Sequence, residues 1–160
     1  MDRLDIAVVP GDGVGSEVMA EGLKALHTVA RVHGGLEFHL RQFPWGCEHY
    51  LKTGRMMDED GLAALADHQA ILLGAVGAPG VVPDHVSLWG LLLPIRKTFD
   101  QYVNLRPIKL LQGVPSRLVG KGPEDIDFVV VRENTEGEYS GVGGRVHVGT
   151  PYEVAVQSNI

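Results

Sequence analysis

The sequence lacks the features that mark secreted, membrane-spanning and nucleic-acid-binding proteins. Cys47 is the single cysteine in 160 residues, so no internal disulfide can form and a cytoplasmic location is expected. No apolar run approaches the roughly 20 residues that span a bilayer, and the start MDRLDIAVV indicates a strand rather than a signal peptide. The net charge of −6 argues against a broad electrostatic surface for nucleic acid. What remains is a globular protein with neither a membrane nor a nucleic-acid partner, which its 44% of hydrophobic residues fits.

Positive charge is nevertheless gathered in one stretch. Residues 91–121 hold six lysines and arginines against one acid, Asp100, a local net charge of +5 that leaves −11 for the rest. Such a basic island favours a small anionic ligand. A solvated basic face is the alternative, and charge alone does not separate the two.

Hydrophobic periodicity indicates alternating strands and helices at the start of the chain. Apolar residues 4–9 run into Pro10-Gly11-Asp12-Gly13, the pattern of a buried strand followed by a turn. Apolar positions from Val18 to Ala30 recur at helical spacing, with Ser16 as the expected cap and His33-Gly34 as the stop. Further strands are expected over 37–43 and 70–73, and short helices over 47–52 and 58–66. This order predicts a parallel sheet with right-handed crossovers, and hence an α/β fold.

From residue 75 onward the periodicity is weaker. Residues 75–87 are expected to form a loop, and residues 91–99 a short helix despite Pro94. Two more strands are expected over 102–111 and 127–132, joined by a long loop. Residues 137–149 contain five glycines, and no element is predicted there.

The first turn, Gly11-Asp12-Gly13-Val14-Gly15, has the composition of an anion-binding loop. It follows a strand and opens a helix, so its backbone N–H groups are placed to hold an anion. The third glycine comes one residue too early for the dinucleotide pattern G-x-G-x-x-G, and no Gly-Lys-Ser/Thr follows as in a P-loop. A tight turn without a ligand is the competing interpretation.

Three arginines and a tyrosine are the candidate chemical groups. Arg96 closes a helical stretch, Arg106 lies in the following strand, and Arg132 comes directly after the apolar residues 128–131. If these elements are neighbours, their guanidinium groups can grip the two carboxylates of one ligand, since each forms paired hydrogen bonds with a carboxylate. Tyr139 is a possible general acid. The alternatives are surface arginines and a packing tyrosine.

Together these segments resemble the β-decarboxylating dehydrogenases, the family of isocitrate and isopropylmalate dehydrogenases. Order and spacing agree through about residue 157, and the stretch from Val82 to Pro107 is most similar to the tartrate and D-malate branch. The resemblance implies an isopropylmalate-dehydrogenase-like α/β fold, with a mostly parallel sheet and flanking helices, here truncated. The matching segments are AVVPGDGVGSEV (7–18), LLGAVGAPG (72–80), LLLPIRKTFDQYVNLRP (91–107) and DFVVVRENTEGEYSG (127–141).

The resemblance also assigns roles. Family members transfer a hydride from a 2-hydroxy acid to NAD, and a divalent metal, Mg²⁺ or Mn²⁺, then assists loss of CO₂. Tyr139 would protonate the resulting enolate. Trp89 departs from the family, where several relatives carry an acid that touches the cofactor. Substrate-binding residues would be Arg96, Arg106, Arg132 and Leu92, and cofactor-binding residues Gly74, Ala75, Val76, Gly77 and Trp89.

Leu92 and Gly90 bear on substrate choice. Leu92 lies one helical turn before Arg96 and so shares its face. Relatives that use isocitrate have an amide and a hydroxyl side chain at these two positions, which pair with a third carboxylate. Because Leu92 and Gly90 offer no such partner, isocitrate is disfavoured. Leu92 and Leu93 would also suit an isopropyl group, which keeps isopropylmalate as the alternative to D-malate or tartrate.

Other parts of the family pattern have no counterpart in this sequence. The catalytic lysine, the metal-binding aspartates and the main adenosine-binding loop are missing, and the histidines show no ligand spacing. We therefore expect no metal site in this chain and no catalysis by it alone. Residues 1–100 would begin the large α/β domain and residues 101–160 the second, substrate and dimer domain, both incomplete. The full-length family forms homodimers.

The leading hypothesis is thus the N-terminal part of an NAD-dependent, decarboxylating 2-hydroxy-dicarboxylate dehydrogenase. An isopropylmalate-dehydrogenase-type fragment is one alternative. A non-catalytic remnant that binds a dicarboxylate or a partner is another, because it would keep the same arginines. A generic nucleotide-binding module is disfavoured by the glycine spacing.

Overall fold

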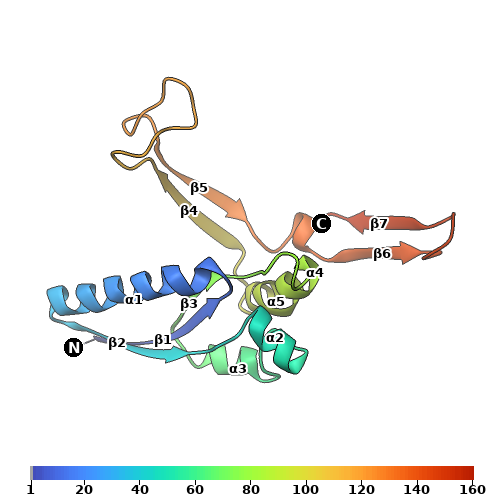
Figure 1. The fold of residues 1–160 in the computed structure, drawn as a ribbon, viewed down its shortest axis with the longest axis horizontal. Coiled ribbons are helices and arrows are strands. Elements are labelled where there is room, and N and C mark those ends of the chain that lie inside the picture. The colour runs from blue at the N-terminus through green and yellow to red at the C-terminus, as the bar shows by residue number, and fades with distance from the viewer. Residues whose placement is uncertain (1) are drawn as a thin grey trace. The chain divides into compact units, whose positions relative to one another are not determined.

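The computed structural model describes residues 2–160 and divides the chain into two compact units. Unit 1 is Met1–Thr98 and unit 2 is Phe99–Ile160. Each unit has its own strands and hydrogen-bonding pattern (Figure 1). The assignment of the two parts to a large domain and to the start of a second domain stays a prediction.

Unit 1 is a three-stranded parallel sheet with helices. The strand order is β2-β1-β3, and both pairings of β1 are parallel, so the predicted α/β fold is confirmed. Helix α1 runs along one face of this sheet, with α2 and α3 toward the other side (Figure 1). The elements are β1 (Asp2–Gly11), α1 (Val14–His33), β2 (Leu36–Gln42), α2 (Cys47–Thr53), α3 (Gly61–Ala66), β3 (Ala70–Ala75), α4 (Asp84–Ser87), the π-helix η1 (Leu88–Leu92) and α5 (Leu93–Thr98).

Strand β1 is the centre of the hydrophobic core because it is apolar on both faces. Ile6 and Val8 pack with Met19 of α1, and partly buried side chains of β2 and β3 surround them. Ala7 and Val9, which point to the opposite face, are also fully buried. A strand that is covered on both faces has a continuous run of apolar residues. Residues 4–9 are therefore recognisable as a strand from the sequence.

Both ends of α1 depend on glycine. Gly34 has φ 71°, and its N–H donates to Ala30 O, so the predicted stop is confirmed. The predicted cap by Ser16 is wrong. The helix already begins at Val14, with Gly13 in the cap position, and Ser16 lies inside the first turn. The positive φ of Gly13, 54°, lets the chain turn into the helix three residues earlier than a cap at Ser16 predicts.

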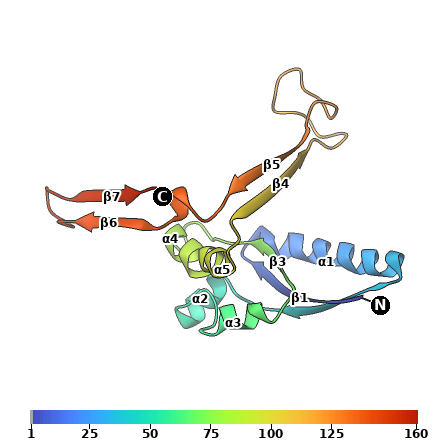
Figure 2. The same cartoon turned by 180° about the vertical axis from the view of Figure 1, so that it is seen from behind.

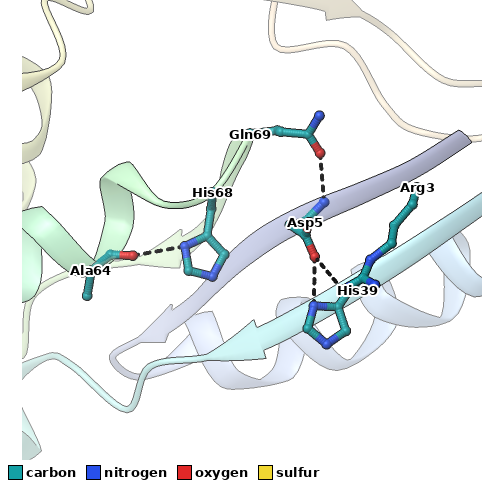
Figure 3. A network of polar contacts seen from close by, with 6 residues as sticks. All are labelled: Arg3, Asp5, His39, Ala64, His68 and Gln69. Atoms are coloured by element: carbon teal, nitrogen blue, oxygen red, sulfur yellow. Dashed lines mark hydrogen bonds and ion pairs between the residues drawn. The ribbon is translucent and has the colours of Figure 1, made fainter.

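A polar cluster joins the three strands at the beginning of β1 (Figure 3). The Asp5 carboxylate accepts hydrogen bonds from Arg3 (3.1 Å) and from His39 of β2 (2.7 Å). The Asp5 N–H donates to the side-chain oxygen of Gln69, directly before β3, at 2.9 Å. The hydrogen bond from Arg3, with the further one from His39, lowers the pKa of Asp5. These contacts help to fix the register of β1 with both neighbours.

Three glycines let the backbones of β1, α1 and β3 meet where the strands end. A Cβ on Gly11 would overlap Ala75 O, and one on Gly74 would overlap Pro10 O. A Cβ on Gly15 would also overlap Pro10 O and would lie 2.7 Å from Ala75 N. All of these neighbours are backbone atoms, which cannot rotate away. Side chains are therefore excluded at these positions.

The segment after β3 is more helical than predicted. Residues 84–87 of the expected loop form α4, which begins after Pro83 in the extended conformation that favours a helix start. The helix expected over 91–99 begins earlier, as η1, and continues as α5. Leu93 N–H donates to Leu88 O, five residues back, and Pro94, which has no N–H, follows. The wide π turn thus lies where proline interrupts the α-helical bonding.

Unit 2 consists of two antiparallel strand pairs (Figure 2). The pair of β4 (Val103–Lys109) and β5 (Asp127–Glu133) confirms two predicted strands. The pair of β6 (Val142–Val146) and β7 (Val154–Ser158) was not predicted. Its glycines conceal the strand pattern, although Gly143 is needed because a Cβ there would overlap Val156 O of β7. The short 3₁₀ helix η2 (Gly137–Tyr139) lies between the two pairs in sequence.

Apolar side chains of unit 2 remain exposed. Leu105 of β4 is 63% exposed and its partner Val131 of β5 is 68% exposed. None of the helices within residues 2–160 is both long and apolar enough to cross a membrane.

Two glycines of α1 provide a matched test of the backbone contact. Gly15→Ala should lower the free energy of unfolding by about 3 kcal/mol, because its methyl group would collide with the backbones of β1 and β3. Gly22→Ala in the same helix meets nothing within 4 Å and should raise that free energy by about 0.5–1 kcal/mol. Urea unfolding followed by circular dichroism measures both. Equal effects of the two changes would refute the proposed role of Gly15.

Candidate functional site

One face of the β4–β5 pair gathers the candidate substrate groups of unit 2. Asn104 lies directly opposite Arg132 in the antiparallel register. Arg106 lies two residues after Asn104 on β4, and therefore on the same face. The Arg106 Nε–H donates to Asn104 Oδ1 at 3.2 Å. The register thus places two guanidinium groups as diagonal neighbours, with an amide between them.

Arg132 and Tyr139 are in direct contact. The Arg132 guanidinium donates a hydrogen bond to the Tyr139 hydroxyl oxygen, and its Cζ lies 5.0 Å from the centre of the ring. Arginine has no acceptor, so the Tyr139 oxygen is the acceptor here and the phenol keeps its own proton for another partner. Glu138 Oε1 lies 3.8 Å from Arg132 Nη2 and partly balances the positive charge. Arg132 is about one-third exposed, at 32%, so it remains accessible to a ligand.

The turn between β5 and Tyr139 is held by two residues that the sequence analysis missed. The Glu133 carboxylate accepts hydrogen bonds from Thr135 N (2.7 Å), Thr135 Oγ1 (2.9 Å) and Glu136 N (2.8 Å). Desolvation raises the pKa of Glu133, but these hydrogen bonds outweigh it and bring the pKa to about 2. The buried Asn134 donates to Gln101 O at 3.1 Å and so ties the turn to the start of β4. An acid directly before Asn-Thr was the available signal for such a turn.

The arrangement can bind a carboxylate and deliver a proton next to it. Arg106 and Arg132 supply positive charge and hydrogen-bond donors, and Tyr139 supplies a hydroxyl group in contact with Arg132. Of the predicted site residues, the structure brings these three together. Arg106 lies in the middle of β4 rather than at an end.

The other predicted site residues belong to unit 1. Gly74 and Ala75 end β3, and Val76 and Gly77 follow directly. Their contact with a cofactor, and the convergence of Arg96 with the other two arginines, stay predictions. Trp89 in η1 is 47% exposed, with Lys97 Nζ 4.8 Å from the centre of its ring. Leu92, which ends η1, and Arg96 of α5 are half-buried.

The glycine-rich turn uses its amides internally. Asp12 N–H donates to Ala75 O (2.7 Å), Gly15 N–H to Asp12 O (2.8 Å) and Ser16 N–H to Gly13 O (3.4 Å). The Asp12 carboxylate is buried at the same place and would repel an anion. The structure therefore favours the interpretation of a tight turn without an anion.

Asp12 is a further residue that sequence reasoning missed. Its Oδ1 accepts the N–H of Cys47, at the start of α2, at 2.6 Å. Its Oδ2 accepts the N–H of Gly77 at 2.9 Å. Burial, together with a hydrogen bond and the negative charge of Asp12, raises the pKa of the Cys47 thiol to about 11. Cys47 is therefore a packed thiol at neutral pH rather than a nucleophile.

A metal site is not formed by the part of the chain described. Within residues 2–160, no three histidine, cysteine, aspartate or glutamate side chains lie close enough together to hold an ion. Divalent metals need several oxygen or nitrogen ligands from one cluster. The residues present therefore do not fit a metal centre.

Comparison with known proteins shows which family the chain resembles. The chain is 54% identical to a probable tartrate dehydrogenase/decarboxylase of Bacillus subtilis (strain 168) and 52% identical to the D-malate dehydrogenase [decarboxylating] of Escherichia coli (strain K12). Both matches cover 100% of this chain but only 44% of the relative, so the chain spans less than half their length. The expected likeness to the tartrate and D-malate branch, confined to the N-terminal half, is confirmed.

A solved structure and a family profile extend the comparison. The apo β-decarboxylating dehydrogenase of Thermococcus kodakarensis superimposes with a TM-score of 0.57 at 30% identity, over 98% of this chain and 41% of that one. The profile of the family described as isocitrate/isopropylmalate dehydrogenase matches residues 5–160. With that match across both units, the chain belongs to the isocitrate/isopropylmalate dehydrogenase family.

Proposed function

We propose that the chain is the N-terminal part of an NAD-dependent oxidoreductase that oxidises and decarboxylates a 2-hydroxy dicarboxylic acid of the D-malate or tartrate type. The observation that carries the proposal is the face of β4–β5, where Arg106 and Arg132 flank Asn104 and Arg132 contacts Tyr139. Membership of the family and the names of the two relatives support the same reaction class. A cytoplasmic location and a homodimeric full-length form belong to this proposal.

Each residue of this face has a task in that reaction. Arg106 and Arg132 hold carboxylate oxygens of the substrate, since both sit on one face with guanidinium donors. Asn104 fixes the direction of Arg106 through its hydrogen bond. Tyr139 gives its proton to the carbon from which CO₂ departs. Because Arg132 occupies an acceptor site on the Tyr139 oxygen, the phenol is oriented while its proton remains available.

NAD and a divalent metal are the proposed cofactors. When bound, NAD would supply the hydride acceptor for the alcohol carbon, and residues 74–77 with Trp89 would border its site in this chain. The exposed Trp89 ring suits such a border, but Gly77 N–H is already bonded to Asp12 and is not available as a donor. The ligands of Mg²⁺ or Mn²⁺ would come from polypeptide that the longer relatives have beyond the matched part.

Substrate choice rests on Gly90 and Leu92. A Cβ at Gly90 would lie 2.6 Å from Met56 Cγ, and Met56 is buried, so position 90 has no space for a polar side chain. Leu92 offers no hydrogen bond to a third carboxylate. Leu93 is buried at 6% exposure, so of these two leucines Leu92 is the more accessible to an isopropyl group. This weakens the case for isopropylmalate relative to D-malate or tartrate.

A chimaera tests the proposal directly. Residues 1–160 would replace the matching part of the Bacillus subtilis relative, and NAD reduction would be assayed with D-malate, tartrate, isopropylmalate and isocitrate in Mn²⁺. We expect the highest kcat/KM with D-malate or tartrate, and no turnover by residues 1–160 alone. A preference for isopropylmalate or isocitrate contradicts the substrate assignment. A folded chimaera without turnover would instead indicate a carboxylate-binding remnant.

Substitution of the arginines tests the carboxylate contacts. In the chimaera, Arg132→Met or Arg106→Met should lower kcat/KM by roughly 30- to 1000-fold, equivalent to about 2–4 kcal/mol for a charged hydrogen bond. Arg117→Met, in the exposed loop between β4 and β5, is the matched control and should change kcat/KM less than twofold, roughly the effect of a surface substitution. An unchanged kcat/KM for Arg106→Met or Arg132→Met removes that arginine from the set of substrate ligands.

The role of Tyr139 is separable from binding. Tyr139→Phe should lower overall turnover strongly, because the ring stays but the proton donor is lost. Reduction of the corresponding 2-oxo acid by NADH, which needs no protonation after loss of CO₂, should be affected much less. Comparing the two rates in one preparation provides the measurement. An equal loss in both reactions would identify Tyr139 as a packing residue.

A further inference from the structure

Asp12 links three segments that are distant in sequence. Its side chain is buried, with the residue 8% exposed, and each carboxylate oxygen accepts one backbone N–H. Oδ1 takes the amide of Cys47 and Oδ2 the amide of Gly77, at 2.6 and 2.9 Å. The Asp12 N–H also donates to Ala75 O at 2.7 Å. One residue thus holds the main chain at two points, at Ala75, which ends β3, and at Gly77, two residues later.

The segment after β3 has little means of anchoring itself. Val76, Ala78 and Pro79 carry no polar side-chain atoms, so their side chains cannot form hydrogen bonds. Gly77 has φ 119°, a conformation that glycine tolerates but does not prefer strongly over others. The Gly77 N–H donates to Asp12 Oδ2, and the backbone of Gly77 and Ala78 also hydrogen-bonds to the Cys47 thiol. The segment is therefore held from outside, and Asp12 supplies its charged acceptor.

The carboxylate suits this task better than a neutral side chain would. An ionised oxygen forms stronger hydrogen bonds to amides than a neutral one. It also presents two acceptors in a fixed geometry, one for each segment. An asparagine would direct an NH₂ group at one of the two amides, and that buried N–H would lose its partner.

We propose that Asp12 is a positioning residue for the cofactor, acting through the Gly77 amide and without touching the cofactor itself. The inference rests on the proposed function, which assigns residues 74–77 to the border of NAD. Loss of the carboxylate removes the charged hydrogen bond that holds Gly77, while the substrate face of unit 2 keeps its own contacts. Loss of the Asp12 carboxylate is therefore expected to weaken the binding of NAD but not the binding of the acid.

The test compares Asp12→Asn with Asp58→Asn in the chimaera. Asp58 accepts a hydrogen bond from Trp45 Nε1 at 3.0 Å in the same unit but does not bond to residues 74–77, so it controls for general loss of stability. Asp12→Asn should raise the KM for NAD about tenfold, the effect of losing one charged hydrogen bond. The KM for the acid and the kcat at saturating NAD should stay within about twofold, and Asp58→Asn should leave all three within that range.

The outcomes separate the two proposals. If the unsubstituted chimaera turns over and Asp12→Asn leaves the KM for NAD unchanged, or raises both KM values together, the inference is overturned and the proposed function stands. If the unsubstituted chimaera reduces no NAD, the proposed function is contradicted, and so is the inference that rests on it. If Asp12→Asn does not fold, the test uses Asp12→Ser, which keeps one acceptor. The proposal then requires that Asp12→Ser raises the KM for NAD and leaves the KM for the acid unchanged.

Discussion

The absence of side chains at Gly11, Gly15 and Gly74 is the constraint on which unit 1 depends. It allows the backbones of β1, α1 and β3 to meet at the point where both strands end. Only at that separation can Asp12 N–H reach Ala75 O and the Asp12 carboxylate reach Gly77. A glycine pattern that suggests a phosphate loop is therefore used for packing.

In unit 2, the site residues are positioned by strand pairing rather than by close backbone packing. The two-residue period of β4 and the antiparallel register with β5 place Asn104, Arg106 and Arg132 on one face without any tight packing. The turn that follows is then held by the Glu133 carboxylate, which brings Tyr139 back to Arg132. Strand pairing thus determines the positions of the substrate-binding side chains, and a local turn determines the position of the proton donor Tyr139.

Local patterns in the sequence were sufficient for much of this architecture. The apolar run in β1, the helical spacing of α1 and the Gly34 stop are all determined by neighbours within a few residues. The contacts of Asp12 were not predictable, because its partners lie 35 and 65 residues away. The position of Asn104 required the register with β5, and β6 was hidden because Gly143 and Gly144 replace the side chains that would show alternation. The four-residue α4 was too short to show a helical period.

The central position of β1 has a consequence for synthesis on the ribosome. Ile6 pairs with Leu40 on one side and with Ala70 on the other, so its second partner is made 64 residues later. At roughly 5–20 residues per second, that delay is about 3–13 s. The strand that forms the middle of the sheet is thus translated before both of its partners and is paired on both edges only after β3 is made. During this interval the backbone N–H and C=O groups on its β3-facing edge cannot form their native sheet hydrogen bonds.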